Sequence, residues 1–345
     1  MGFAMFWPDF DFFRRILTAC ALTLASAANA QVASPHALDI PAWFSEGFLD
    51  FNDEAAAAAG SGKRLMLYFG QDGCPYCREL LQTNFSQKPI VEKTRANFVA
   101  IALNIWGDRE TTWTDGRRLS EKALARFLKV QFTPTLLFLG TDGRIVARLN
   151  GYYPPHKFSA ALDYLTTQPE PQQTLAEYLA QHGNEAAQPQ LNAQPFLMKP
   201  PFDLRRGGSG KPLAVIFETR HCKACDEMHR EGLRRADVRA QLVRFDVARF
   251  ALSDPTEVTT PAGAKLSAQA WARELKIAYT PSIVFFDAGN REVLRIEGYV
   301  RPFHLGSAFE YVAQGAYRTQ PEFQRFLQAK AERARAKGQR VDLWK

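Results

Sequence analysis

The same succession of apolar and polar segments occurs twice along the chain. Each copy opens with a short apolar run, Leu65–Phe69 or Leu213–Phe217, which predicts a buried strand. A helix is expected to begin at the cysteine pair that follows. A second strand is then predicted at Phe98–Leu103 in the first copy and at Leu242–Val247 in the second.

The rest of each copy continues in parallel. A polar loop leads into an amphipathic helix, predicted over Ser120–Lys129 and over Ser267–Lys276. A Thr-Pro step opens a third strand, and a hairpin turn and a closing helix follow. This alternation predicts an α/β fold in which a central mixed sheet has helices on both faces.

The two copies also match residue by residue. Lys63–Leu80 falls on Lys211–Met228 at a shift of 148, with six identities in 18 positions. Leu119–Pro134 falls on Leu266–Pro281 at a shift of 147, with nine identities in 16. One deleted residue explains the change of shift. The chain is therefore interpreted as a tandem duplication of one domain.

This interpretation divides the chain into five parts. The expected parts are a signal peptide (1–30), a first domain (38–167), a Pro-rich linker (168–210), a second domain (211–315) and a basic C-terminal helix or tail (316–345). The linker contains "TLAEYLAQHG", which suits a short helix. The linker either packs on one domain or is a mobile tether.

Length and composition agree with this division. A chain of 345 residues can build two cores, and 46% hydrophobic with 23% charged residues excludes global disorder. The net charge of +7 is concentrated after Ala316, where eight Lys or Arg face three Asp or Glu. We interpret this end as a solvated basic helix. No recognisable nucleic-acid module accompanies it.

The N-terminus has the pattern of an export signal. Arg14 and Arg15 precede an apolar stretch, Ile16–Ala28, and "ANA" ends at Ala30 as a small-residue cleavage site. The stretch is shorter than the roughly 20 residues that span a bilayer. We expect the segment to be cleaved after Ala30 and the mature protein to be periplasmic. A lipoprotein box at Cys20 and a twin-arginine signal are the alternatives.

Cysteine usage favours redox chemistry. Of five cysteines, Cys20 would leave with the signal, and the other four form two Cys-x-x-Cys pairs. Cys74 and Cys222 each stand at the start of a predicted helix, where backbone N–H groups and the helix dipole stabilise a thiolate. They are the expected nucleophiles, and Cys77 and Cys225 are expected to resolve the mixed disulfide.

The residues between the cysteines differ between the copies. Pro75 and Tyr76 are expected to stiffen and partly cover the first site, next to its substrate. Lys223, with His221 beside it, adds positive charge at the second site. Greater stabilisation of the thiolate makes a pair more oxidising, so the second site is expected to have the higher reduction potential.

A Thr-Pro step follows each cysteine pair. Pro134 and Pro281 open strands 60 and 59 residues after Cys74 and Cys222. A trans proline can start a strand, but its presence in both copies favours a cis bond. Such a bond would expose backbone to which a substrate strand can hydrogen-bond, and Thr133 and Thr280 would share that groove.

These residues carry a family resemblance. "CPYC…TP" and "CKAC…TP" resemble the thioredoxin fold, and most of the mature chain is covered. "MLYFGQDGCPYC", "TPTLLFLGTDGR" and "GYYPPHKF" are similar to exported thioredoxins of the SoxW type. The resemblance implies dithiol–disulfide exchange with protein disulfides, cis bonds at Pro134 and Pro281, and re-reduction by a membrane carrier of the DsbD or CcdA kind. It implies redox-active disulfides and no further cofactor.

The chain departs from cytosolic thioredoxins in two respects. Gly73 and His221 stand where those proteins have Trp, and Tyr68 and Ile216 stand where they have a buried Asp. Glu218 either replaces that carboxylate in the second copy or is a solvated strand end.

Other polar and aromatic residues leave alternatives open. His229 could join Cys222 and Cys225 around zinc, but its counterpart is Leu81, so no metal is expected. Glu79 and Glu227 suit either proton transfer or an exposed helix face. Trp106 and Trp113 suit either the floor of a substrate groove or the edge of the core.

The pattern as a whole predicts an exported thiol–disulfide oxidoreductase with two active sites, acting in the reducing direction. A disulfide isomerase or oxidase and a redox-independent binding module that uses the same groove remain as alternatives.

Overall fold

The structure is a computed structural model of the chain, and it describes residues 1–2, 38–167, 173–182, 187–206 and 210–341. Leu38–Lys345 forms one compact unit. The apolar stretch before Ala30 and the expected cleavage site lie outside the described residues. Among the helices described, none combines the length and the apolar character needed to cross a bilayer.

The first repeat alternates helices and strands in the expected order. It also has three features that the hydrophobic pattern does not predict: the helices α2 and α4 and the hairpin β3–β4. Its elements are α2 (Phe51–Gly60), β1 (Arg64–Gly70), α3 (Pro75–Glu79), η1 (Leu80–Asn84), α4 (Lys88–Asn97), β2 (Phe98–Asn104), β3 (Glu110–Thr112), β4 (Arg118–Ser120), α5 (Glu121–Phe127), β5 (Thr135–Leu139), β6 (Ile145–Asn150), α6 (Pro155–Thr167) and α7 (Leu175–His182).

The second repeat has the same succession from its first long strand onward, but it begins with the short strand β7 instead of a helix, and it has an additional helical turn, η3. Its elements are β7 (Phe202–Asp203), β8 (Leu213–Glu218), α8 (Lys223–Glu227), η2 (Met228–Leu233), α9 (Ala236–Leu242), β9 (Asp246–Ala251), β10 (Glu257–Thr259), β11 (Lys265–Ser267), α10 (Ala268–Glu274), β12 (Ser282–Phe286), β13 (Glu292–Glu297), α11 (Pro302–Ala313), η3 (Ala316–Arg318) and α12 (Phe323–Ala336). In both repeats, a π-helical turn (η1 or η2) continues the helix that follows the cysteines.

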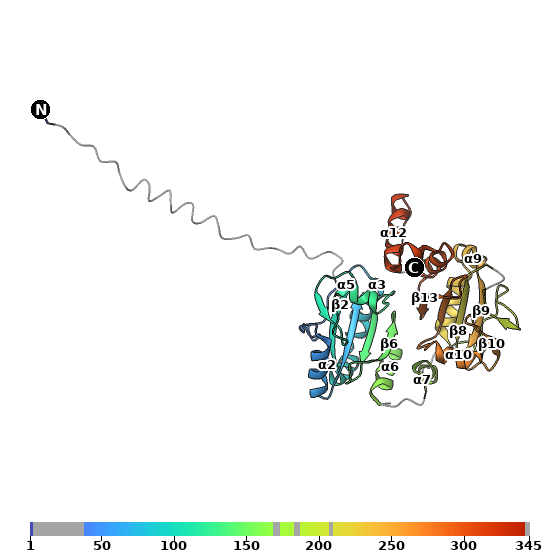
Figure 1. Cartoon of the computed structure of the whole chain (residues 1–345), viewed down its shortest axis with the longest axis horizontal. Helices are drawn as coiled ribbons and strands as arrows, with labels where there is room; N and C mark the ends of the chain where they lie inside the picture. The colour runs from blue at the N-terminus through green and yellow to red at the C-terminus, as the bar shows by residue number, and fades with distance from the viewer. Residues whose placement is uncertain (3–37, 168–172, 183–186, 207–209, 342–345) are drawn as a thin grey trace. The chain divides into compact units, whose positions relative to one another are not determined.

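Each repeat is built on a four-stranded mixed sheet. The strand orders are β2-β1-β5-β6 and β9-β8-β12-β13. The first two strands of each order are parallel, and the remaining pairs are antiparallel. Helices flank both sheets (Figure 1). The predicted fold class, a tandem α/β fold with central mixed sheets, is confirmed.

The first strand of each repeat is apolar throughout because both faces of its sheet are covered. In β1, Met66 and Tyr68 belong to one core cluster, whereas Leu65, Leu67 and Phe69 belong to another. The side chains of β8 divide in the same way between two clusters. This burial on both faces explains why the sequence shows a continuous apolar run rather than alternation.

Part of the segment expected as linker lies within the second repeat. β7 pairs in parallel with β10, Leu197 forms a bridge with Val247, and Leu204 is fully buried. β7, Leu197 and Leu204 all precede Lys211, the expected boundary. A two-residue strand and a single bridge are too short to give a periodic hydrophobic pattern.

The second strand of the second repeat begins later than expected. β9 starts at Asp246, whereas the sequence suggested a start at Leu242. Leu242 ends α9, where it and Val238 are buried at helical spacing against the same core. A short apolar run fits either element until tertiary packing decides.

The linker helix α7 and the C-terminal helix α12 are the same element of the duplicated unit. The hydroxyl of Tyr164 donates to the carbonyl of Gln173 at 2.8 Å, just before α7. The hydroxyl of Tyr311 donates to the carbonyl of Gln320 at 2.6 Å, just before α12. Both pairs of positions are 147 residues apart, the shift that relates the two copies.

The C-terminal helix is solvated on one face only. Phe323, Phe326, Leu327 and Ala331 are buried along α12, so the expectation of a solvated basic helix holds for part of its surface only. Arg325, Arg333 and Arg335 are exposed, whereas Lys330 is partly buried and forms an ion pair with Glu310 of α11 at 2.5 Å.

The two repeats contact each other through equivalent positions. Phe132 of the first repeat lies in a core cluster of the second, with its ring 5.1 Å from that of Phe323. Its counterpart Tyr279 lies in a core cluster of the first repeat, with its ring 4.1 Å from that of Tyr153. Each repeat thus inserts the residue that precedes its Thr-Pro step into the other.

Candidate active site

Each cysteine pair lies between the first strand of its repeat and the following helix. Cys74 is the N-cap of α3, and Cys222 is the N-cap of α8. The N-cap sulfur accepts a hydrogen bond from the backbone N–H of the second cysteine, at 3.0 Å from Cys77 and 3.1 Å from Cys225. Negative charge that develops on the first sulfur after reduction would therefore meet a backbone donor at a helix start.

Both pairs are disulfides in the structure. The Cα atoms of each pair are 5.2 Å apart, within the usual range for this bond. Cys77 and Cys225 are 0% and 2% exposed, whereas Cys74 and Cys222 are 5% and 6% exposed. In each pair the first cysteine is the more accessible, as an attacking sulfur needs to be.

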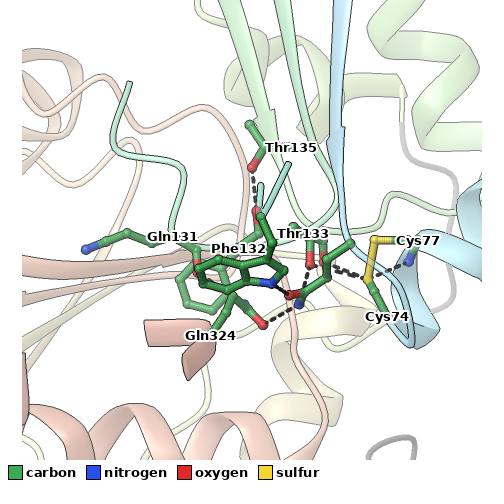
Figure 2. The surroundings of a disulfide bond; sticks show 9 residues. Cys74, Cys77, Gln131, Phe132, Thr133, Thr135 and Gln324 are labelled. Atoms are coloured by element: carbon green, nitrogen blue, oxygen red, sulfur yellow. Dashed lines mark hydrogen bonds between the residues drawn. A yellow bond between two sulfur atoms is a disulfide. The ribbon is translucent and has the colours of Figure 1, made fainter. Parts of the chain in front are cut away.

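The Thr-Pro step of the first repeat lies against its disulfide. The Thr133–Pro134 and Thr280–Pro281 peptide bonds are cis. The hydroxyl of Thr133 donates to the Cys74 sulfur at 3.3 Å, and its carbonyl oxygen is 3.4 Å from the same atom (Figure 2). At the second site the hydroxyl of Thr280 is 4.0 Å from the Cys222 sulfur and 3.1 Å from the Thr219 hydroxyl.

A side-chain network extends the first site beyond the residues predicted from the sequence. Gln71, in the loop after β1, donates from Nε2 to the Thr133 hydroxyl at 3.1 Å and accepts at Oε1 from the Trp106 indole at 2.6 Å. Trp113 is buried in the core against Phe51. Trp106 therefore lies at the groove, whereas Trp113 covers the core. In the sequence, only the position of Gln71 in the loop before Cys74 could have indicated that it belongs to the site.

The two residues between the cysteines of the first site have different surroundings. Pro75 occupies the first turn of α3. The Tyr76 hydroxyl accepts a hydrogen bond from the backbone N–H of Arg301 at 2.8 Å, and its ring meets the edge of the His304 ring at 5.2 Å. Burial raises the pKa of Tyr76 above its usual value and lowers the pKa of His304 to about 4. At neutral pH, both side chains are therefore uncharged.

The second site has a buried acid–base pair beside its cysteine helix. Glu218 ends β8 and is 0% exposed, and His229 follows Cys225 by one helical turn and is 1% exposed. The His229 Nε2 and Glu218 Oε1 atoms are 2.5 Å apart, and the second carboxylate oxygen of Glu218 is buried without a hydrogen-bond partner. Describing Glu218 as a solvated strand end is therefore wrong, because its backbone is still within the sheet and pairs with Leu252.

The same pair bears on the zinc alternative. His229 contacts Glu218 through one ring nitrogen and Gln194 through the other, at 3.2 Å, while Cys222 and Cys225 bond to each other. Within the described ranges, no three His, Cys, Asp or Glu side chains gather as a metal-binding group.

The remaining candidates lie at the edge of the sites. Glu79 and Glu227 are half-buried rather than exposed. Glu79 accepts from the Thr83 hydroxyl at 2.7 Å. Burial, and then the charge of Glu79, raises the pKa of Tyr152 to about 12. His221 and Lys223 are exposed next to Cys222, so water solvates their side chains.

Together these features define a class of protein. Two α/β repeats, each with a disulfide at a helix start, make the chain a thiol–disulfide oxidoreductase. The family model described as thioredoxin-like domain matches residues 51–166 and 206–313, so the chain belongs to that family. The two matches confirm the tandem organisation, which is consistent with the predicted SoxW-like type.

Several solved structures are similar to one repeat of the chain. A thioredoxin-fold protein from Helicobacter pylori is 24% identical over 37% of this chain and 91% of that chain, with a TM-score of 0.31. A thioredoxin from Thermus thermophilus is 27% identical over 34% of this chain and 85% of that chain, with a TM-score of 0.28. No curated protein matches the chain.

Proposed function

We propose that the protein is exported and reduces disulfide bonds of other proteins at two sites. Cys74 and Cys222 are the attacking residues, and Cys77 and Cys225 are the resolving residues. The observation that carries the proposal is the position of the Cys74 sulfur, which accepts both the Cys77 N–H and the Thr133 hydroxyl. Two donors directed at one sulfur favour its thiolate, which is the attacking species.

The exchange proceeds in two steps. The Cys74 thiolate attacks one sulfur of the substrate disulfide, the substrate S–S bond breaks, and the other substrate sulfur leaves as a thiolate. Cys77 then loses its proton and attacks the Cys74 sulfur, which breaks the mixed disulfide and releases the second substrate thiolate. Two electrons pass from the dithiol to the substrate, and each released thiolate takes up a proton. Cys222 and Cys225 act in the same way.

The substrate groove at each site is formed by the Thr-Pro loop: Thr133 and Pro134 in the first repeat, Thr280 and Pro281 in the second. An extended substrate segment would hydrogen-bond to the backbone of this loop beside the attacking sulfur. Pro75 and Tyr76 form the wall of the first groove. Each groove thus positions a substrate disulfide for in-line attack.

Export to the periplasm is supported by the signal-like segment that ends at Ala30 and by the use of all four remaining cysteines in Cys-x-x-Cys pairs. An exported reductant needs electrons from the cytosolic side. The SoxW resemblance supports a membrane dithiol donor of the DsbD or CcdA kind, with no cofactor beyond the two disulfides.

The direction of electron flow is tested by the reduction potential of each pair, measured in full-length chains in which the other pair is changed to serine. Potentials near −270 mV support the reductant, and potentials near −120 mV would instead make the protein an oxidant.

Substrates are tested by trapping. Cys77→Ser and Cys225→Ser should each accumulate mixed disulfides with periplasmic proteins, because the resolving thiol is missing. The matched controls Cys74→Ser and Cys222→Ser should trap none, because they lack the attacking thiol. Full biological activity in all four variants would favour a redox-independent binding module.

A further inference from the structure

The C-terminal helix α12 makes a set of contacts on the groove of the first site. Gln324 accepts at Oε1 from Gln71 Nε2 at 2.8 Å and donates from Nε2 to the backbone carbonyl of Gln131 at 3.1 Å (Figure 2). Since Gln71 also donates to Thr133, which donates to the Cys74 sulfur, a continuous polar network joins α12 to the disulfide.

Three further contacts hold the helix there. The Arg325 guanidinium lies 4.2 Å from the centre of the Trp106 ring, and Arg126 of α5 forms an ion pair with Glu322 at 2.7 Å. Phe323, the first residue of α12, packs on Phe132. The helix therefore contacts the loop that precedes Pro134 on both its apolar and its polar side.

The hydrogen bond from Gln324 to the Gln131 carbonyl bears on which substrates can reach the first site. This carbonyl lies two residues before Thr133, on the backbone strip to which an extended protein substrate would hydrogen-bond. Because the Gln324 amide already uses this acceptor and Phe323 covers Phe132, a substrate segment cannot lie along the strip until α12 moves. A small disulfide needs only the Cys74 sulfur and does not need the strip.

The second site keeps the arginine–glutamate ion pair, since Arg273 is the counterpart of Arg126, but the described residues show no equivalent of the Gln324 hydrogen bonds. Glu177 of α7, the counterpart of Gln324, binds Arg273 of α10 at 2.8 Å and the backbone N–H of Thr174. The backbone N–H of Ala278, the counterpart of Gln131, is 3.5 Å from the Glu297 carboxylate of its own repeat. Across the described part of the chain, we find no hydrogen bond from α7 to the Thr280–Pro281 step.

We propose that Gln324 and Arg325 are specificity-determining residues of the first site. With α12 bound, Cys74 and Cys77 exchange faster with small disulfides than with extended protein disulfides, which react mainly at Cys222 and Cys225. This assignment rests on the proposed thiol–disulfide exchange, and it divides that activity between the repeats by substrate size.

The test uses the full chain with Cys222→Ser and Cys225→Ser, so that only the first site reacts. The pre-reduced protein is mixed with bis(2-hydroxyethyl) disulfide or with insulin, and both rate constants are measured. Two variants are made in this background. The first combines Gln324→Ala with Arg325→Ala, and the second, Gln328→Ala on the exposed face of α12, is the matched control. Gln324 is half-buried, Arg325 is exposed, and the buried Phe323, Phe326 and Leu327 are unchanged, so the helix is expected to persist.

The double variant should raise the insulin rate about tenfold, the combined effect of losing two hydrogen bonds and a cation–π contact. It should change the small-disulfide rate less than about twofold, and Gln328→Ala should change neither rate. An unchanged insulin rate, or an equal rise in both rates, would overturn the assignment. Absence of any reaction with the small disulfide in the starting background would instead contradict the exchange activity of this site.

Helix content and the midpoint of urea unfolding are measured for the double variant, because a change in either would reveal a folding defect. Should they change, Arg325→Glu alone gives a second measurement, because it removes the Trp106 contact at an exposed position. Its insulin rate should rise while its small-disulfide rate stays constant, and an insulin rate equal to that of the starting background would count against the assignment.

Discussion

Asn150 and Glu297 occupy the same position of the two repeats and hydrogen-bond to each other, with the Asn150 amide as donor. Contacts between equivalent positions are the mark of an isologous interface, here formed within one chain. Phe132 and Tyr279 follow the same rule, since each enters the core of the opposite repeat. The duplicated domains therefore associate through the loops that precede their Thr-Pro steps.

The first prediction concerns this interface. Phe132→Ala should lower the free energy of unfolding by about 3 kcal/mol, because it leaves a cavity against Phe323 in the core of the second repeat. Urea unfolding measures the loss. Phe127→Ala is the control, since that ring is 40% exposed, and it should cost less than about 1 kcal/mol. Equal losses in the two variants would mean that Phe132 contributes nothing specific.

The second prediction concerns the buried Glu218–His229 pair. His229→Leu, which introduces the residue of the first repeat, should cost roughly 3 kcal/mol because it leaves the Glu218 carboxylate buried without its partner. Adding Glu218→Gln should recover part of that loss, since a neutral amide is cheaper to bury. Urea unfolding of the two single variants and the double variant gives the coupling energy. Additive losses would contradict a direct interaction.

The third prediction is a pH dependence from His304. Burial lowers its pKa to about 4, below the unfolded value of 6.5. The neutral ring fits the site, so its contribution to stability is complete above pH 6.5 and is lost as the pH falls toward 4. At pH 5 the unfolded chain should gain about 2 kcal/mol from protonation of this histidine.

His304→Phe keeps an aromatic edge against Tyr76 and removes the titration. Its loss of stability between pH 7 and pH 5 should therefore be smaller than that of the parent chain by about the same 2 kcal/mol. His182→Gln on the exposed face of α7 serves as control and should follow the parent. Identical pH profiles for His304→Phe and the parent would exclude His304 as the source.

The fourth prediction separates the two Thr-Pro steps. The Thr133 hydroxyl is 3.3 Å from the Cys74 sulfur, whereas the Thr280 hydroxyl is 4.0 Å from that of Cys222. Thr133→Val should slow iodoacetamide alkylation of reduced Cys74 at pH 7 by about fivefold, because one hydrogen bond to the thiolate is lost. Thr280→Val should slow that of Cys222 less than about twofold. The reverse order would show that the distances in the oxidised form do not describe the thiolate.

Local signals in the sequence were sufficient for the repeated architecture. Two apolar runs, each followed by Cys-x-x-Cys and a Thr-Pro step, predicted the β1 and β8 strands, the helix starts at Cys74 and Cys222 and the strands after Pro134 and Pro281. Such features depend on hydrophobic pattern and on residues with restricted backbones, which neighbours in the chain specify.

Other parts of the structure depend on contacts between residues far apart in the chain. No local pattern indicates that Gln71 binds Gln324, that Trp106 lies under Arg325, or that Glu218 meets His229 in the interior.

The sequence by itself thus determined a duplicated α/β domain and its four redox cysteines, because both follow from short patterns that occur twice. Only the tertiary structure decided that α12 lies on the first groove and that Phe132 and Tyr279 enter each other's repeats. The physical reason is that burial is a property of the assembled surface: an amphipathic helix such as α12 shows which face is apolar, but not which surface will cover it.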